Sequence, residues 1–365
     1  MASECVYVST GSGLQLLNPL DGTIHHTASP CSGTAIACIG EDFVLSPQRK
    51  DASLFAWRRG HKSVHSKCRL AEPLGSLLVS SDGSFCFGGG QSGTLYVWEV
   101  WSGNLIRSWH GHHKSVRCLG LTEDGSFLLT GGDDAVVSVW SALDLLDSSD
   151  LGAGVGGGQL SVRERFSWAD HSDAVTAVHV GKGPGGLGRV ATASLDHTVL
   201  IYDNVSSRQL LLTVACPAWV SSVALSGDEA WVYAGCGDGA IIALSLLESA
   251  GAIEALSERV VLEGHSNAVT GLVLHGQGTV LVSASEDGTV RAWDAQATRQ
   301  CVQVTHLKVA ALAMVDAGLV DPAALTGQDA NTGAPFAPLR KHVSGLASSD
   351  SSLLPMKRSL CHVEA

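Results

Sequence analysis

Three histidines lie close together in the sequence, as His110, His112 and His113. Imidazole side chains are common ligands of zinc and other transition metals. Aspartate or cysteine ligands at a fixed spacing are not found beside them, and neither a His-Glu-x-x-His pattern nor an EF-hand spacing occurs. We therefore expect one structural histidine with two exposed neighbours, and the sequence predicts no metal site.

Glycine spacing gives a second chemical possibility, nucleotide binding. Gly181, Gly183 and Gly186 match a dinucleotide-binding fingerprint, which places a phosphate at the N-terminus of a helix. Here the glycines are followed by Arg189–Ala193, a strand pattern, so we interpret the stretch as a loop. The Gly-rich run 152–158 fails for the same reason. No Walker loop or Gly-x-Ser-x-Gly motif occurs, and no nucleophile, base and orienting group form a set, so we predict neither an enzyme nor a cofactor.

The strongest pattern is a recurring set of four polar and aromatic residues. In the stretch 264–294 the set is His265, Ser283, Asp287 and Trp293. Two further sets keep this order, namely His112, Thr130, Asp134 and Trp140, and His171, Thr192, Asp196 and Tyr202. A hydrogen-bond chain through such a set can tie a loop, a strand and a turn together. We therefore interpret these side chains as structural rather than catalytic or ligand-binding.

The elements that must position these sets are short antiparallel strands. Apolar residues alternate through Ala268–Leu274 and Thr279–Ser283, a turn follows at Glu286–Gly288, and Thr289–Trp293 alternates again. This is a four-stranded unit of one sheet, and such units recur about every 40 to 45 residues. They resemble WD40 repeats, which form β-propellers.

The number of units follows from the residue that closes each one. Weaker units have Asp51 before Trp57, Asp238 before Leu244, and Ser92 in place of the acid before Trp98. The closing positions are then Leu17, Trp57, Trp98, Trp140, Tyr202, Leu244 and Trp293. The sequence predicts an all-β, seven-bladed propeller whose chain begins part-way through a blade.

A partial first unit requires a completing unit at the far end. Two apolar runs, Lys308–Val315 and Gly318–Thr326, can supply it. We expect both to pair with strands from residues 13–28 in one shared blade, because ring closure removes exposed strand edges.

Domain limits follow from where the repeat pattern weakens. We expect a propeller over residues 1–343 with an insertion loop at about 141–165, a smaller loop at Leu246–Leu256, and a flexible tail over residues 344–365. The segment Gln328–Pro338 is expected to run extended across a surface. Large loops on a rigid ring are common sites of partner binding.

Composition limits the classes of function. The net charge of −12 disfavours direct RNA or DNA binding, which depends on Lys and Arg. Ten cysteines are present without a Cys-x-x-Cys pair, which favours buried free thiols in a reducing compartment over disulfides or zinc. Several fall inside expected strands, namely Cys38, Cys86, Cys118 and Cys236.

The N-terminal residues lack the features of a signal peptide, and no window is long and apolar enough for a membrane span. We therefore interpret the sequon Asn204–Ser206 as a hairpin loop.

Several stretches resemble one particular family, the WD40 subunit of the ribosomal-RNA-processing complex called the rixosome. They are Trp98–Asn104, Arg189–Tyr202, Glu263–Asp294 and Pro335–His342, together with the degenerate unit ending at Leu244 and the split first unit. The resemblance implies a nuclear scaffold subunit that supports pre-ribosomal RNA processing and maturation of the large ribosomal subunit. It implies binding to a large helical-repeat protein and a AAA-type ATPase, with indirect contact to the pre-ribosomal particle.

Two other classes of scaffold remain as alternatives. A substrate receptor of a ubiquitin ligase often carries Arg or Lys two positions beyond the Trp-Asp pair. The corresponding residues here are Gln296 and Val205, which argues against that class. A signalling or membrane-trafficking scaffold would be distinguished by the proteins that co-purify with it.

Overall fold

The computed structural model describes strands over most of the first 320 residues. Described are residues 3–10, 13–28, 31, 33, 35–48, 51–146, 162, 164–183, 186–246, 259–275, 278–296, 299–307, 311–320 and 339, with the backbone alone for residues 3, 4 and 311–320. The expected tail 344–365, most of the 141–165 insertion, most of Leu246–Leu256 and the segment Gln328–Pro338 lie outside the described residues.

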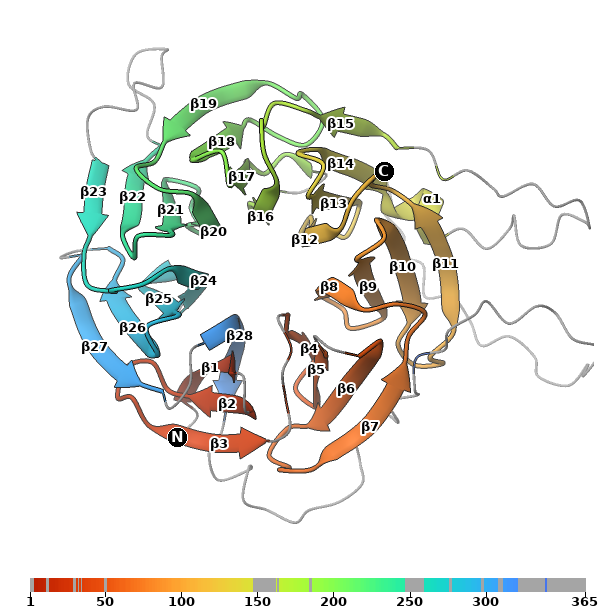
Figure 1. The fold of residues 1–365 in the computed structure, drawn as a ribbon, viewed down its shortest axis with the longest axis horizontal. Helices are drawn as coiled ribbons and strands as arrows, with labels where there is room; N and C mark the ends of the chain where they lie inside the picture. The colour runs from red at the N-terminus through yellow and green to blue at the C-terminus, as the bar shows by residue number, and fades with distance from the viewer. Residues whose placement is uncertain are drawn as a thin grey trace, which may run out of the picture.

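Seven four-stranded antiparallel sheets surround a central axis, as blades of a propeller (Figure 1). From the axis outward, blade 1 contains β28 (Ala311–Val320), β1 (Ser3–Thr10), β2 (Gly13–Leu17) and β3 (Ile24–Ala28). Blade 2 contains β4 (Ala37–Ile39), β5 (Phe43–Pro47), β6 (Ser53–Arg58) and β7 (Val64–Arg69). Blade 3 contains β8 (Leu74–Val79), β9 (Phe85–Gly90), β10 (Thr94–Glu99) and β11 (Leu105–His110).

The other blades repeat this order. Blade 4 contains β12 (Val116–Leu121), β13 (Phe127–Gly132), β14 (Val137–Ser141) and β15 (Phe166–Trp168). Blade 5 contains β16 (Val175–Val180), β17 (Val190–Ser194), β18 (Thr198–Tyr202) and β19 (Leu210–Ala215). Blade 6 contains β20 (Val220–Leu225), β21 (Trp231–Cys236), β22 (Ile241–Ser245) and β23 (Arg259–Leu262), and blade 7 contains β24 (Val269–His275), β25 (Val280–Ser285), β26 (Thr289–Asp294) and β27 (Cys301–His306).

The predicted seven-bladed architecture is confirmed. All seven closing residues lie on the third strand of a blade and are buried, from Leu17 on β2 to Trp293 on β26. The core lies between neighbouring sheets, where both faces of a blade are covered. For example, the cluster between blades 5 and 6 contains Val199 and Ile201 from one sheet and Val232 and Ile242 from the next. Burial of such aliphatic side chains, at about 1.5–3 kcal/mol each, is the main force that holds the ring together.

Hydrogen bonds also join neighbouring blades. Thr176 on β16 donates through its hydroxyl to the carbonyl of Val220 on β20, at 2.6 Å. Arg189, just before β17, donates through Nη1 to the carbonyl oxygens of Glu229 (3.1 Å) and Leu246 (3.2 Å) in blade 6. These bonds satisfy backbone groups that the ladders within each blade leave free.

The blade shared by the two ends of the chain is confirmed, but the predicted pairing partner of its C-terminal strand is wrong. β28 is one strand over Ala311–Val320, not two runs, and it pairs antiparallel with β1 rather than with residues 13–28. β1 in turn pairs with β2, so the N-terminal segment supplies three strands and the C-terminal segment supplies one. β1 was not predicted because the apolar residues of Ser3–Thr10 form one short run, Cys5–Val8, without the alternation that marks a strand.

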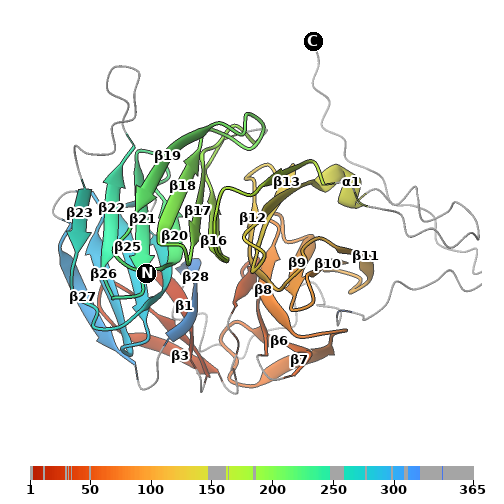
Figure 2. The same ribbon diagram turned by 45° about the horizontal axis from the view of Figure 1, so that its top comes forward.

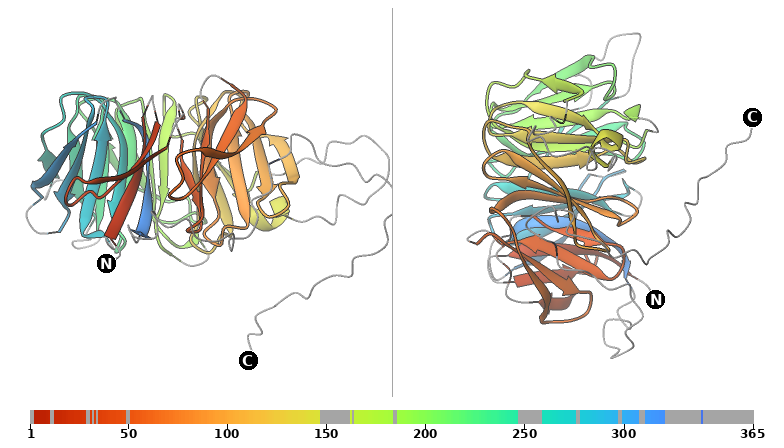
Figure 3. Two further views of the ribbon diagram at one scale, coloured as in Figure 1. Left: turned by 90° about the horizontal axis from the view of Figure 1, so that it is seen from below. Right: turned by 90° about the vertical axis from the view of Figure 1, so that its right-hand side faces the viewer.

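The turns divide into two faces of the disc, which Figure 3 shows edge-on. Because strands alternate in direction, turns between first and second strands and between third and fourth strands lie at one end of each blade. We call this the lower face, and we call the opposite end the upper face. The short helix α1 (Ala142–Leu146) follows β14 and contacts β14 and β11. Figure 2 shows α1 beside β13 of blade 4. No helix within the described part of the chain is long and apolar enough to cross a bilayer.

Candidate functional site

The His265 set in blade 7 forms one continuous hydrogen-bond chain. Trp293 Nε1 donates to Ser283 Oγ at 2.8 Å, and Ser283 Oγ lies 2.7 Å from His265 Nε2. His265 Nδ1 lies 3.0 Å from Asp287 Oδ2. Because the ionised Asp287 carboxylate can only accept, Nδ1 of the neutral imidazole donates to it, and Nε2 accepts from the Ser283 hydroxyl. The proton of the neutral imidazole therefore sits on Nδ1 and points to Asp287.

The charges of this set are those of a neutral histidine beside an ionised aspartate. Burial lowers the pKa of His265, and the Asp287 carboxylate opposes this only in part. Burial alone would raise the pKa of Asp287, but hydrogen bonds from the Thr289 hydroxyl and from the Ser266 and Thr289 amides outweigh it and lower the pKa to about 2. A neutral, fully bonded imidazole with its ring buried has no free nitrogen for proton transfer or for a metal.

The His112 set in blade 4 has the same geometry. His112 Nε2 lies 2.7 Å from Thr130 Oγ1, and Trp140 Nε1 donates to the same hydroxyl at 3.0 Å. Asp134 Oδ1 lies 3.0 Å from His112 Nδ1, and its other oxygen accepts from the His113 amide at 3.0 Å. His110 and His113 are exposed, as predicted, with their ring centroids 6.3 Å apart.

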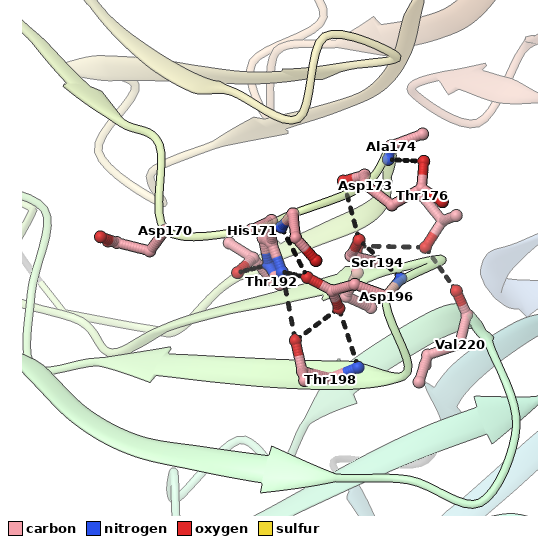
Figure 4. A network of polar contacts seen from close by, with 12 residues as sticks. Asp170, His171, Asp173, Ala174, Thr176, Thr192, Ser194, Asp196, Thr198 and Val220 are labelled. Carbon is pink, nitrogen blue, oxygen red and sulfur yellow. Dashed lines mark hydrogen bonds and ion pairs between the residues drawn. The ribbon is translucent and has the colours of Figure 1, made fainter.

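The His171 set in blade 5 departs from this plan at its aromatic residue. His171 lies 2.8 Å from Thr192 Oγ1 and 3.0 Å from Asp196 Oδ2 (Figure 4). Tyr202 does not reach Thr192, and its hydroxyl donates instead to Asp170 Oδ2 at 2.9 Å. The phenol thus bonds to the residue before the histidine, in the loop that leads into the blade.

Sequence reasoning missed a fourth set in blade 3, where a glutamate replaces the histidine. Glu72 accepts hydrogen bonds from the Ser92 amide (2.7 Å), the Ser92 hydroxyl (2.7 Å) and the Tyr96 hydroxyl (2.9 Å). Ser92 had been identified as the replacement of the turn acid. The signal that would have found Glu72 is its position 20 residues before Ser92, close to the distance that separates histidine and aspartate elsewhere.

In blades 2 and 6 a cysteine stands at the position that corresponds to the histidine. Cys31 precedes Asp51 in blade 2, and its thiol lies 3.6 Å from the Ser46 hydroxyl and 3.5 Å from the Ser9 hydroxyl. Cys216 precedes Asp238 in blade 6, where a hydrogen bond with the Cys236 thiol lowers its pKa against the effect of burial. All nine cysteines in the described residues are free thiols.

The remaining sequence candidates lie in ordinary loops. Gly181, Gly183 and Gly186 belong to the connection between β16 and β17, where the Gly181 amide donates to the Arg189 carbonyl at 2.7 Å. Asn204 lies in the turn between β18 and β19, as expected, and its side-chain oxygen accepts from the amides of Ser206 and Ser207. Within the described ranges, no three His, Cys, Asp or Glu side chains are grouped so that they could hold a metal ion.

Comparison with a family model identifies the repeats. The family described as WD domain, G-beta repeat matches residues 103–141, 208–242 and 257–294. Each matched span runs from the outermost strand of one blade into the third strand of the next, and two of the spans contain the His112 and His265 sets.

Comparison with individual proteins identifies close relatives along nearly the whole chain. WD repeat-containing protein 18 of Bos taurus is 31% identical over 353 residues, which cover 95% of this chain and 77% of the bovine protein. The Homo sapiens protein of the same name is 31% identical, with the same coverage. Pre-rRNA-processing protein IPI3 of Yarrowia lipolytica is 34% identical over 277 residues, which cover 70% of this chain and 60% of that protein. The chain therefore belongs to the WD40-repeat family that includes WD repeat-containing protein 18 and pre-rRNA-processing protein IPI3.

Proposed function

We propose that this protein is a non-catalytic scaffold subunit in pre-ribosomal RNA processing and maturation of the large ribosomal subunit. The observation that carries the proposal is family membership, since relatives named as pre-rRNA-processing proteins match this chain through its propeller blades. The described side chains support a binding role, because both ring nitrogens of the buried His112, His171 and His265 are committed to hydrogen bonds within their blades. We propose accordingly that the three His sets are structural.

The finer features of this role are also proposals. The protein acts in the nucleus, in the nucleolus or nucleoplasm, and binds a large helical-repeat protein and a AAA-type ATPase. The net charge of −12 supports protein contacts and argues against direct binding to RNA phosphates. The propeller domain is proposed to extend to residue 343, with residues 344–365 as a separate tail.

Affinity purification with mass spectrometry, combined with sedimentation on a gradient, tests the function. We expect ribosome-assembly factors to co-purify and the protein to migrate with large pre-ribosomal particles. Depletion should cause unprocessed spacer-containing RNA to accumulate. Recovery of cullin adaptors or of membrane-coat subunits alone would replace this function with one of the other scaffold classes.

A further inference from the structure

One large aromatic side chain on the lower face is exposed although its turn is held firmly. Trp101 lies at the tip of the turn between β10 and β11 and is 69% exposed. Ser102 donates to the Glu99 carboxylate at 2.6 Å, and the Val100 amide donates to the Ser84 carbonyl at 2.9 Å. Val100 itself is buried. The indole ring is therefore presented to solvent from a preorganised backbone.

A cavity of about 270 Å³ lies beside Trp101, where the lower ends of blades 2 and 3 meet. Its apolar lining comes from Ile39, Phe43 and Val100. The turn between β4 and β5 and the turn Ser81–Ser84 between β8 and β9 complete it. An exposed indole next to an apolar cavity is a frequent feature of binding surfaces, because it buries a large area when a partner docks.

The charge of this cavity is negative. Asp42 and Asp82 are its only charged lining side chains among the described residues, and both are exposed, as is the neighbouring Glu41. Burial tends to raise the pKa of Asp82, but hydrogen bonds from Ser80 and Ser84 lower it, so this carboxylate is ionised at neutral pH.

One basic side chain lies close to this cavity. Arg59 donates through its backbone amide to the Asp42 carbonyl at 2.7 Å, and through Nη2 to the carbonyl of the lining residue Gly40 at 3.4 Å. Its guanidinium carbon also lies 5.8 Å from the centre of the Tyr7 ring, which belongs to blade 1. Arg59 is not itself a lining residue, and the three acidic side chains Glu41, Asp42 and Asp82 outnumber this one cation.

We propose that the Trp101 cavity is a docking site for a basic segment of a protein partner, which places a lysine or arginine side chain against the indole. The ring face attracts a cation, and the Asp42 and Asp82 carboxylates lie where they can pair with it. The same carboxylates repel the phosphates of RNA. This docking site rests on the proposed scaffold function, for which it supplies one binding surface and the chemistry of the partner.

Blade 4 offers matched control positions. Asp124 occupies the turn position of Asp82 and likewise accepts from the amide and hydroxyl of its turn serine, Ser126. Leu143 stands three residues after Trp140, as Trp101 stands three after Trp98, and it is also exposed. Blade 4 therefore has the acidic turn, but its exposed apolar residue at this position is a leucine and not a tryptophan.

Fluorescence anisotropy with the purified full chain tests the site. The probes are labelled peptides of alternating lysine and glycine or of alternating arginine and glycine, with a glutamate-glycine peptide as the charge control. We expect Trp101→Ala and Asp82→Asn each to weaken binding of the basic peptides about 3- to 10-fold. Leu143→Ala and Asp124→Asn should leave binding unchanged, and added salt should weaken it in the wild type.

Three outcomes would overturn the proposal. They are equal binding by all four variants and the wild type, a preference for the glutamate peptide or for single-stranded RNA, and a wild-type dimer that Trp101→Ala dissociates in sedimentation, which would make the cavity a contact between two copies. Thermal unfolding of each variant checks that the ring is intact. Sedimentation of the wild type with pre-ribosomal particles is scored separately, so loss of peptide binding and failure of the proposed function are distinguishable.

Discussion

The Glu72 carboxylate receives both the amide and the hydroxyl hydrogen bond of Ser92, each at 2.7 Å. In blades 4, 5 and 7 an aspartate in the turn provides the carboxylate and a histidine in the preceding loop provides the donor. In blade 3 the two roles are exchanged between loop and turn. Each of these four blades therefore has one carboxylate that joins the loop to the turn. The turn supplies it in blades 4, 5 and 7, and the loop supplies it in blade 3.

This exchange predicts a coupled pair of substitutions. Ser92→Asp places a second carboxylate beside Glu72 and should lower the free energy of unfolding by about 1–2 kcal/mol. Combining it with Glu72→His creates a histidine–aspartate pair and should recover part of that loss. Urea denaturation of both single variants and the double variant gives the coupling energy. Purely additive effects would show that the two positions do not interact.

The Ser283 hydroxyl is the central link of the blade 7 chain. Ser283→Ala leaves the buried Trp293 Nε1 and His265 Nε2 without partners and should cost about 2–4 kcal/mol. Ser283→Thr keeps the hydroxyl, as blade 4 does with Thr130, and should cost far less. Urea denaturation compares the two variants. Equal losses would mean that the cost comes from packing and not from the hydrogen bonds.

A glycine in one blade makes room for the histidine loop of the next. Gly239 has φ +92, and an added Cβ would lie 2.5 Å from the His265 carbonyl oxygen. Gly239→Ala should therefore cost about 2–4 kcal/mol, from backbone strain and from displacement of this loop. Gly125 has φ +69 and open space around it, so Gly125→Ala should cost only about 1 kcal/mol. Thermal unfolding measures both, and a similar loss in the two variants would remove the steric part of this explanation.

Stability should fall as the pH drops below about 6.5, because buried histidines bind protons less well in the folded chain than in the unfolded chain. Burial and Lys182 lower the pKa of His179 to about 4, and burial lowers that of His265. A depressed histidine pKa means that the unfolded state takes up more protons, so the free energy of unfolding decreases between about pH 6.5 and 4. His179 alone should account for about 1–2 kcal/mol between about pH 7 and 5.

Thermal unfolding over this pH range is the measurement, and His179→Gln is the variant. Between about pH 7 and 5 this variant should lose about 1–2 kcal/mol less of its free energy of unfolding than the wild type loses. A profile that keeps the wild-type slope in His179→Gln would show that this imidazole is protonated in the folded protein.

Closure of the ring depends on β1, which pairs with β28 on one side and β2 on the other. A chain lacking residues 1–10 should aggregate or melt at a lower temperature, because β28 and β2 then have unpaired edges. A peptide of residues 1–12 added in trans should restore part of the stability. An unchanged melting temperature and a monomeric truncated protein would show that the ring does not need this strand.

The sequence predicted the blades because each repeats the same buried contacts. Trp140, Tyr202 and Trp293 recur on third strands, and Asp134, Asp196 and Asp287 hold the turns before them, so spacing alone located these elements. β1 and the pairing partner of β28 were not predictable in this way. They depend on contacts between the two ends of the chain, which local alternation does not encode.

The candidate sites show a similar division. The His265 set follows from a fixed spacing, and the structure brings its members together as expected. Glu72 could not be predicted from that spacing, because in blade 3 the carboxylate lies in the loop before the blade and the turn carries Ser92 in place of an acid. The Trp101 cavity combines turns from two blades, so no single repeat contains it.

The position of β28 also determines the order of events during synthesis. The strand that completes the innermost position of blade 1 ends at Val320, whereas its partner β1 emerges from the ribosome well before it. At about 5–20 residues per second, the inner edge of β1 waits about 15–60 s for its native neighbour. Throughout that interval the nascent chain carries an open strand edge, which is covered when β28 pairs with β1.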